Sequence, residues 1–138
     1  MSGKKRKVVV LPCSGIGKTL GTVGRDVMYE LVDNLRPDVT ATTCLPLLMI
    51  EDPCAKRMVT ENPAITIDGC PLGCALKCVQ SIGVTPSRGY KAIDFCKNHR
   101  DLKPEGIVEL NDAGNKLVVL AAQELAKEID KIMGEENA

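Results

Sequence analysis

Compact apolar runs alternate along this chain with segments in which apolar residues recur at helical spacing. Strands are predicted at residues 7–11, 39–44, 64–67 and, more weakly, 90–95. Helices are predicted at residues 23–35, 53–59, after Cys70 and at 117–133. Such alternation requires crossovers that return the chain to the same end of one sheet. We therefore expect an α/β fold: a small, Rossmann-like three-layer sandwich with a mostly parallel sheet of about four strands and helices on both faces.

Composition narrows the classes of partner. The 138 residues suit one domain, which we place over the whole range 1–138. Lys plus Arg and Asp plus Glu both number 18, and the chain has no Trp, one Phe and two Tyr. A neutral chain with so few aromatic rings lacks both a phosphate-binding surface and a base-stacking platform, so no nucleic-acid partner is expected. The apolar run Val8–Leu11 is too short for a signal peptide or a membrane span, and we expect a cytoplasmic protein with no membrane partner.

Seven cysteines are the most unusual part of the composition. In a reducing compartment, such a set indicates metal or thiol chemistry more often than disulfide bonds. Cys13, Cys44 and Cys70 each follow or end a predicted strand, and Cys54 begins the next predicted helix. Loops that leave the carboxyl ends of parallel strands gather at one edge of the sheet. These four cysteines are therefore expected at a common edge.

A second pattern extends from Cys70. With Pro71 as the first helical position, Cys70, Cys74 and Cys78 fall at i, i+4 and i+8 on one helix face. Two adjacent sulfurs could bind one ion, whereas the third is a further turn away. The free N–H groups of a helix N-terminus lower the pKa of a thiol, and three predicted helices begin beside the cysteines of the common edge, so we expect the sulfurs there, including that of Cys13, to be ionised. For Cys96, and also for Cys78, burial as a small apolar side chain is the alternative.

The combination of Cys13-Ser14-Gly15, Cys44 and Asp68-Gly69-Cys70-Pro71 with Cys74 resembles the DGC-domain family of proposed zinc-binding proteins, named for the central Asp-Gly-Cys. The resemblance covers about residues 8–83. It implies four chelating cysteines, which are Cys13, Cys44, Cys70 and Cys74 here, and it implies no reaction. Many members have a second cysteine in the first motif, where this chain has Ile16. Replacement of one ligand by Cys54 or Cys78 therefore stays open.

Other motifs are incomplete or ambiguous. The run Gly17-Lys18-Thr19 lacks the earlier glycine of a phosphate-binding loop, because Pro12 stands at that position. No Cys-x-x-Cys pair is present. Asp68 suits two roles equally: it could orient a metal ligand, or it could be an ordinary turn residue before Gly69. His99, the only histidine, follows a polar run and is expected to be solvated.

Three hypotheses about function follow. The first is a metal-binding protein whose partner is a zinc ion, held by Cys13, Cys44, Cys70 and Cys74. The second is a thiol- or metal-dependent enzyme that uses the same thiolates, with Cys13 as a candidate, in sulfur, alkyl or redox transfer. The third is an iron–sulfur protein, since four thiolates also suffice for a cluster. The residues assign no substrate, catalytic residue, protein partner or oligomeric state.

Overall fold

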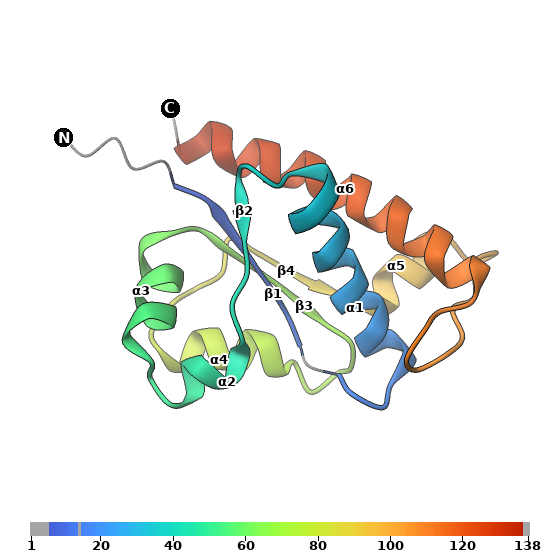
Figure 1. The fold of residues 1–138 in the computed structure, drawn as a ribbon, viewed down its shortest axis with the longest axis horizontal. Coiled ribbons are helices and arrows are strands. Elements are labelled where there is room, and N and C mark those ends of the chain that lie inside the picture. Colours follow the sequence, from blue (N-terminus) through green and yellow to red (C-terminus); the bar gives the residue numbers. More distant parts are fainter. Residues whose placement is uncertain (1–5, 14, 137–138) are drawn as a thin grey trace.

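The computed structural model of the protein describes residues 6–13 and 15–136. Four parallel strands form one sheet in the order β2-β1-β3-β4 (Figure 1). Their bounds are Val8–Pro12 (β1), Thr40–Ala41 (β2), Ala64–Asp68 (β3) and Arg88–Lys91 (β4). Ser14 of the first cysteine motif lies outside the described residues. The predicted parallel sheet of about four strands is confirmed.

Helices cover both faces of this sheet and complete three layers (Figure 1). One face carries α1 (Thr19–Glu30) with its π-helical continuation η1 (Leu31–Leu35), α5 (Ala92–Asn98) and α6 (Asp112–Glu136). The other face carries α2 (Leu45–Met49), α3 (Pro53–Glu61) and α4 (Cys74–Ser81). Each face has its own cluster of buried apolar side chains. The α/β sandwich is therefore as predicted.

The side chains of β1 show why an unbroken apolar run makes a strand here. Val8 and Val10 belong to the core beneath α1, α5 and α6, whereas Val9 and Leu11 belong to the core beneath α2, α3 and α4. Successive side chains of a strand point to opposite faces, so a strand that is covered on both faces needs apolar residues throughout. All four residues are completely buried.

The order of the strands reverses at β1, which has β2 on one side and β3 on the other. As a result, the loop after β1 leads to α1 on one face, while the loop after β3 leads to α4 on the opposite face (Figure 1). Proteins with open parallel sheets bind ligands where two loops part in this way. Cys13 lies in the first of these loops and Cys70 in the second.

The prediction of a fourth strand over residues 90–95 is wrong in its second half. Strand β4 ends at Lys91, and α5 begins at Ala92, so the second half of the range 90–95 is helical. Ala92 and Phe95 are both buried, at positions i and i+3 on the inner face of α5. Over so short a segment, apolar residues do not distinguish the period of a strand from that of a helix.

The region around the second strand also differs from the prediction. Strand β2 stops at Ala41, and the hydroxyl of Thr42 donates a hydrogen bond of 2.7 Å to the Val10 carbonyl. The apolar segment that follows forms α2, a helix that is not predicted from the sequence. Leu45 and Leu48 are buried one helical turn apart in α2, and this packing accounts for the helix.

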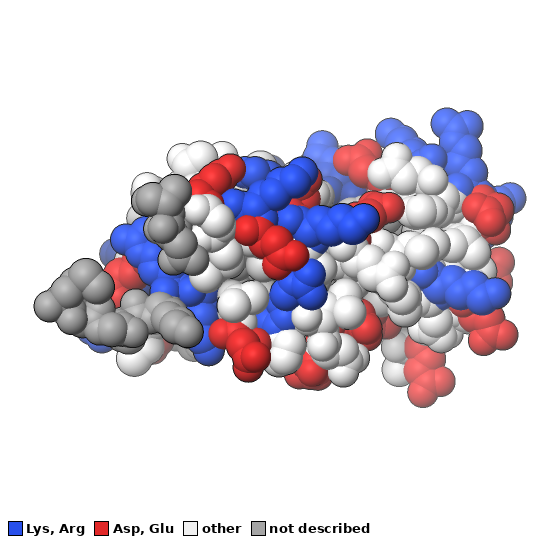
Figure 2. Space-filling view, turned by 90° about the horizontal axis from the view of Figure 1, so that it is seen from above, with Lys and Arg blue, Asp and Glu red and all other residues white. Residues whose placement is uncertain are grey.

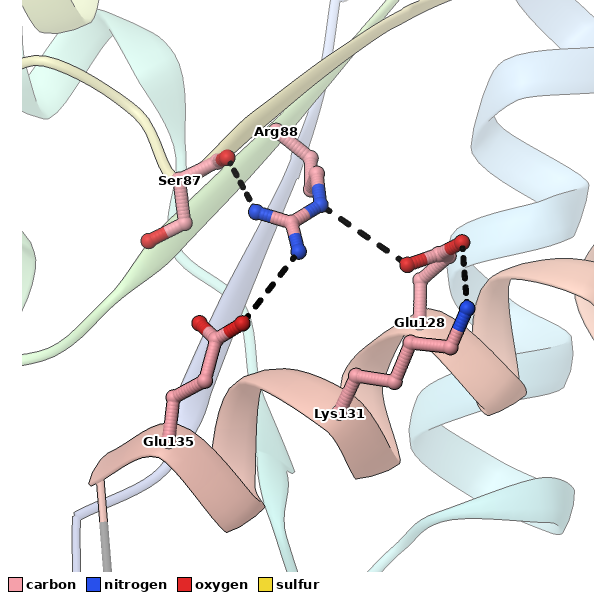
Figure 3. Close-up of polar contacts among 5 residues, drawn as sticks. All are labelled: Ser87, Arg88, Glu128, Lys131 and Glu135. Carbon is pink, nitrogen blue, oxygen red and sulfur yellow. Dashed lines mark hydrogen bonds and ion pairs between the residues drawn. The ribbon is translucent and has the colours of Figure 1, made fainter. Parts of the chain in front are cut away.

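Charged side chains fasten α6 to the rest of the molecule. Arg88 of β4 lies 3.7 Å from Glu128 and 3.8 Å from Glu135, both on α6 (Figure 3). Arg36, which follows η1, donates two hydrogen bonds of 2.8 Å to the carboxylate of Asp130.

Lys and Arg side chains are interspersed with Asp and Glu over the face seen in Figure 2. Among the described helices, none has the length and apolar character needed to cross a membrane.

Candidate metal centre

Cys13 joins the loops that follow β1 and β3. Its backbone N–H donates to the carbonyl of Ile67 at 2.8 Å, which extends the pairing of the two strands. Its sulfur accepts a hydrogen bond of 3.1 Å from the backbone N–H of Gly69. Only 5% of Cys13 is exposed. The first predicted cysteine therefore lies directly against the Asp-Gly-Cys segment, 56 positions away from Gly69 in the chain.

Three glycines allow this approach. A Cβ atom on Gly69 would lie 2.7 Å from the backbone nitrogen of Gly21 in α1, and a Cβ atom on Gly15 would overlap the Cα of Gly21. Gly15 also has a φ of +57°, a left-handed conformation that favours glycine. The contacts are between backbones, so no side chain could move to make room. This glycine junction of Gly15, Gly21 and Gly69 brings the two loops together.

Asp68 fixes the start of α4. Its buried carboxylate accepts hydrogen bonds from the backbone N–H groups of Ala75 at 2.7 Å and Leu76 at 3.3 Å. Gly73, the N-cap residue, has no side chain for this task and adopts a φ of +65°. The carboxylate at the end of β3 therefore caps a helix that begins six residues later. Both Asp68 and Gly69 shape the candidate site through their contacts.

Cys70 and Cys74 flank this cap in different settings. Cys70 is half-buried in the turn after β3, and Cys74 is the exposed first residue of α4. The prediction that Cys70 begins a helix face shared with Cys74 and Cys78 is wrong, since the helix starts after Gly73. Both cysteines are near enough to Cys13 for their charge to affect its ionisation. Sulfur atoms from the two loops thus share one electrostatic environment.

The ionisation of Cys13 differs from the prediction. Burial raises the pKa of the Cys13 thiol, while the hydrogen bond from Gly69 acts to lower it. Negative charge on Asp68, Cys70 and Cys74 raises the pKa further. The expected stabilisation of a thiolate by a helix N-terminus does not prevail at Cys13, because burial of the side chain raises its pKa more than the Gly69 hydrogen bond lowers it. The surroundings of Cys13 favour the neutral thiol.

Two further cysteines lie on the other loops. Cys44 is the exposed N-cap residue of α2, a helix that packs against α4. Cys54 is exposed near the start of α3 and lines a separate cavity of about 440 Å³ together with Lys7 and Asn62. Asn62 accepts a hydrogen bond from the Lys7 backbone at 3.1 Å, which places this cavity beside the beginning of β1. Cys54 therefore faces a region different from that around Cys13, and the expectation that it shares an edge of the sheet with Cys13 is wrong.

The remaining predicted residues contact other parts of the molecule. The sulfur of Cys78 lies 3.5 Å from that of Met49, and Cys96 packs against the core beneath α5 and α6. The Nε2 atom of His99 lies 2.9 Å from a carboxylate oxygen of Glu124, so this histidine is half-buried and paired rather than freely solvated.

Comparison with known proteins identifies the family. The family model described as DGC domain matches residues 9–113, from β1 to the beginning of α6. The chain belongs to the DGC domain family. No match was found among curated proteins or among solved structures. Each residue of the Asp-Gly-Cys triplet has its own role in this DGC domain. Asp68 caps α4, Gly69 donates a hydrogen bond to the sulfur of Cys13, and Cys70 is a candidate metal ligand.

The sulfurs of this DGC domain do not form a ready coordination sphere. Within residues 6–13 and 15–136, no three His, Cys, Asp or Glu side chains are arranged to hold a metal ion. The thiols of Cys13, Cys70 and Cys74 come to one edge of the sheet, but binding of a single ion requires their side chains to move closer together.

A cavity of about 490 Å³ opens beside Cys70, and the sequence did not indicate it. Two cationic side chains, Lys91 and Lys97, line it from the end of β4 and from α5. Its other lining residues are Leu20, Gly69, Pro71, Gly89, Ile93 and Asp94. The predicted fourth strand extends to residue 95, so the prediction does not place Lys91 at the carboxyl edge of the sheet. A strand that ends at Lys91 would have indicated a cationic side chain beside Cys70.

Proposed function

We propose that this DGC domain binds a zinc ion through the thiolates of Cys13, Cys70 and Cys74, with Cys44 as the fourth ligand. The observation that carries the proposal is the hydrogen bond between the Gly69 N–H and the Cys13 sulfur. Because Cys70 is bonded to Gly69 along the chain, this contact holds the turn that carries Cys70 beside the Cys13 side chain, and this proximity supports the choice of ligands. Four thiolates are a common ligand set for structural zinc.

The chemistry of the donors fits zinc. Zinc binds Cys sulfur at about 2.3 Å in a tetrahedron and needs no further protein group in a structural site. Cys13 is held by the sheet and by Gly69, whereas Cys44 and Cys74 are exposed at the starts of α2 and α4. In the proposal the exposed side chains turn toward the fixed one. Asp68 keeps the start of α4 in place while they do so.

Charge also supports the binding of a cation. Burial raises the pKa of Cys13, and the negative groups around it raise the pKa further, so gathering several thiolates without a counterion costs free energy. A divalent cation at this point would offset these charges and favour the thiolate forms. Ligands from three loops would tie the carboxyl edge of the sheet together, and metal binding would add to the free energy of unfolding.

Replacement of single cysteines by serine, followed by measurement of the metal content per chain, tests the proposal. Zinc is expected to fall sharply in the variants at Cys13, Cys44, Cys70 and Cys74. The matched control is Cys96→Ser, at a half-buried cysteine in α5 that packs against the other core. Full zinc content in both the Cys13→Ser and Cys70→Ser variants would overturn the proposal. A brown protein that contains iron and sulfide would favour the iron–sulfur alternative instead.

The cavity beside Cys70 favours one further candidate, a thiol-dependent enzyme. A small substrate could enter the space between Cys70, Lys91 and Lys97 and meet a cysteine sulfur there. This reading requires a cysteine that still reacts while the metal is bound. Protection of Cys70 from iodoacetamide in the zinc-loaded protein would exclude it.

A further inference from the structure

The sulfur atoms of Met49 and Cys78 lie close together between α2 and α4, and we call them the sulfur pair. The Sγ atom of Cys78 and the Sδ atom of Met49 are 3.5 Å apart. Met49 is the last residue of α2 and is 61% exposed, and Cys78 lies in the middle of α4 and is half-buried. The pair is therefore in contact and also accessible to an ion from solvent.

The core beneath the two helices holds the pair together. Leu45 and Leu48 of α2 and Ala75 and Val79 of α4 are buried in the same apolar cluster. Cys78 precedes Val79, and Met49 follows Leu48, so each sulfur-bearing residue is next to a buried anchor. The backbone positions of both residues are thus set by packing rather than by the sulfur contact itself.

We propose that Met49 and Cys78 bind a soft monovalent metal ion, Cu(I), through their thioether and thiolate sulfurs. Thiolate and thioether donors select soft ions, whereas the usual protein ligands of zinc are Cys, His and carboxylate. A monovalent soft ion that is held by two sulfurs alone prefers a linear arrangement, so sulfurs that are each about 2.3 Å from it lie about 4.6 Å apart. The observed separation of 3.5 Å must therefore increase by about 1 Å, and rotation of the exposed, unbranched Met49 side chain can provide this. Cys78 would release its thiol proton to solvent when the ion binds.

The contact between these two sulfurs does not require the proposed zinc site, although burial and then negative charge on Cys74 and Asp68 raise the pKa of the Cys78 thiol. Neither Met49 nor Cys78 is among its four ligands, and the glycine junction is not required for the contact between α2 and α4. Variants that lose zinc because Cys13 or Cys70 is replaced should therefore keep the sulfur pair. The zinc proposal can fail while the Cu(I) proposal holds, and the reverse is also true.

Nuclear magnetic resonance of the protein with ¹³C-labelled methionine methyl groups tests the Cu(I) proposal directly. Anaerobic titration with Cu(I) should shift the Met49 methyl resonance, which is assigned by its loss in Met49→Leu. The shift should disappear in Cys78→Ser and persist in Cys13→Ser. An unchanged Met49 resonance in the intact protein, or an equal shift in Cys78→Ser, would overturn the proposal. Ag(I), which undergoes no redox change under these conditions, should give the same pattern.

Affinity gives a second readout that does not require assignment. Competition with a chromophoric Cu(I) chelator, in a background in which Cys13, Cys44, Cys70 and Cys74 are all replaced by serine so that the proposed zinc ligands do not take up the ion, should show that Met49→Leu weakens Cu(I) binding by about tenfold or more, since even indirect changes around a metal cost about that much. Met58→Leu is the matched control, because Met58 lies in α3 and packs against the same core. Equal affinities of the two variants would contradict the assignment of Met49 as a ligand.

Discussion

Gly69 and Gly21 are packed so closely that a Cβ atom on Gly69 would lie 2.7 Å from the Gly21 nitrogen. The contact joins the turn after β3 to the first residues of α1. It also directs the Gly69 N–H toward the sulfur of Cys13. The middle residue of the Asp-Gly-Cys triplet thus has a packing role that no larger residue could fill without moving the backbone.

Gly69→Ala should destabilise the protein. The added methyl group meets backbone atoms, so the two loops must move apart, at a cost of about 1–3 kcal/mol in the free energy of unfolding. Urea unfolding measures this change. Gly134→Ala is the control, because a Cβ at that position of α6 meets nothing within 4 Å and should leave stability unchanged or raise it by about 0.5–1 kcal/mol. Equal stabilities of the two variants would show that the junction is not tight.

Asp68→Ala should remove the cap of α4. The carboxylate accepts two backbone N–H groups, so its loss is expected to cost about 1.5–3 kcal/mol, as for other bonds to charged groups. Asp52→Ala provides the comparison, since Asp52 caps α3 with one side-chain bond, to Ala55 at 2.9 Å. Thermal unfolding should show a larger decrease in Tm for the Asp68 variant. The reverse order would contradict the role given to Asp68.

Cys13 should be among the slowest cysteines to react with iodoacetamide in the metal-free protein. Its thiol is buried and its pKa is raised, so little thiolate is present at neutral pH. Exposed Cys54 should be labelled first, and labelling of Cys13 should accelerate as the pH rises. Asp68→Asn removes a negative charge that raises the pKa of Cys13, so it should speed labelling at a given pH. Mass spectrometry of the labelled peptides reports both rates, and faster labelling of Cys13 than of Cys54 at neutral pH would refute this view.

The pair of Arg36 and Asp130 should give a small dependence of stability on pH. Hydrogen bonds from Arg36 lower the pKa of the Asp130 carboxyl below its usual value. A carboxyl whose pKa is lower in the folded state stabilises the protein above its unfolded pKa of about 3.9, and this contribution disappears as the pH falls through the lowered value. Because the Asp130 side chain is 55% exposed, Asp130→Asn should cost only about 0.2–1 kcal/mol at pH 7. Unfolding curves of the two proteins should converge in strong acid; a difference that persists there would have another cause.

The fold was predictable because its central strands are buried on both faces. In Val8–Leu11 every residue is apolar. A strand between two layers of helices buries all of these side chains, alternately in one core and in the other. The short α5 was not predictable in the same way. Tyr90, Ala92 and Phe95 fit either period, and only the packing of Ala92 and Phe95 beneath the sheet decides for the helix.

The location of the candidate site followed from topology, but its details did not. Cysteines after β1 and β3 were expected at one edge, and the contact between Cys13 and Gly69 places them there. The left-handed conformation of Gly73, which keeps Cys70 out of α4, leaves no periodic signal in the sequence. The raised pKa of Cys13 also depends on burial and on nearby charge, and neither is visible before the chain is folded.

The zinc K-edge X-ray absorption spectrum of the purified protein tests the proposed site most directly. The proposal predicts sulfur neighbours at about 2.3 Å from zinc, with fewer sulfurs or no retained zinc in Cys13→Ser. A spectrum with only nitrogen and oxygen neighbours at about 2.0–2.2 Å, or an intact protein that retains no zinc, would contradict it.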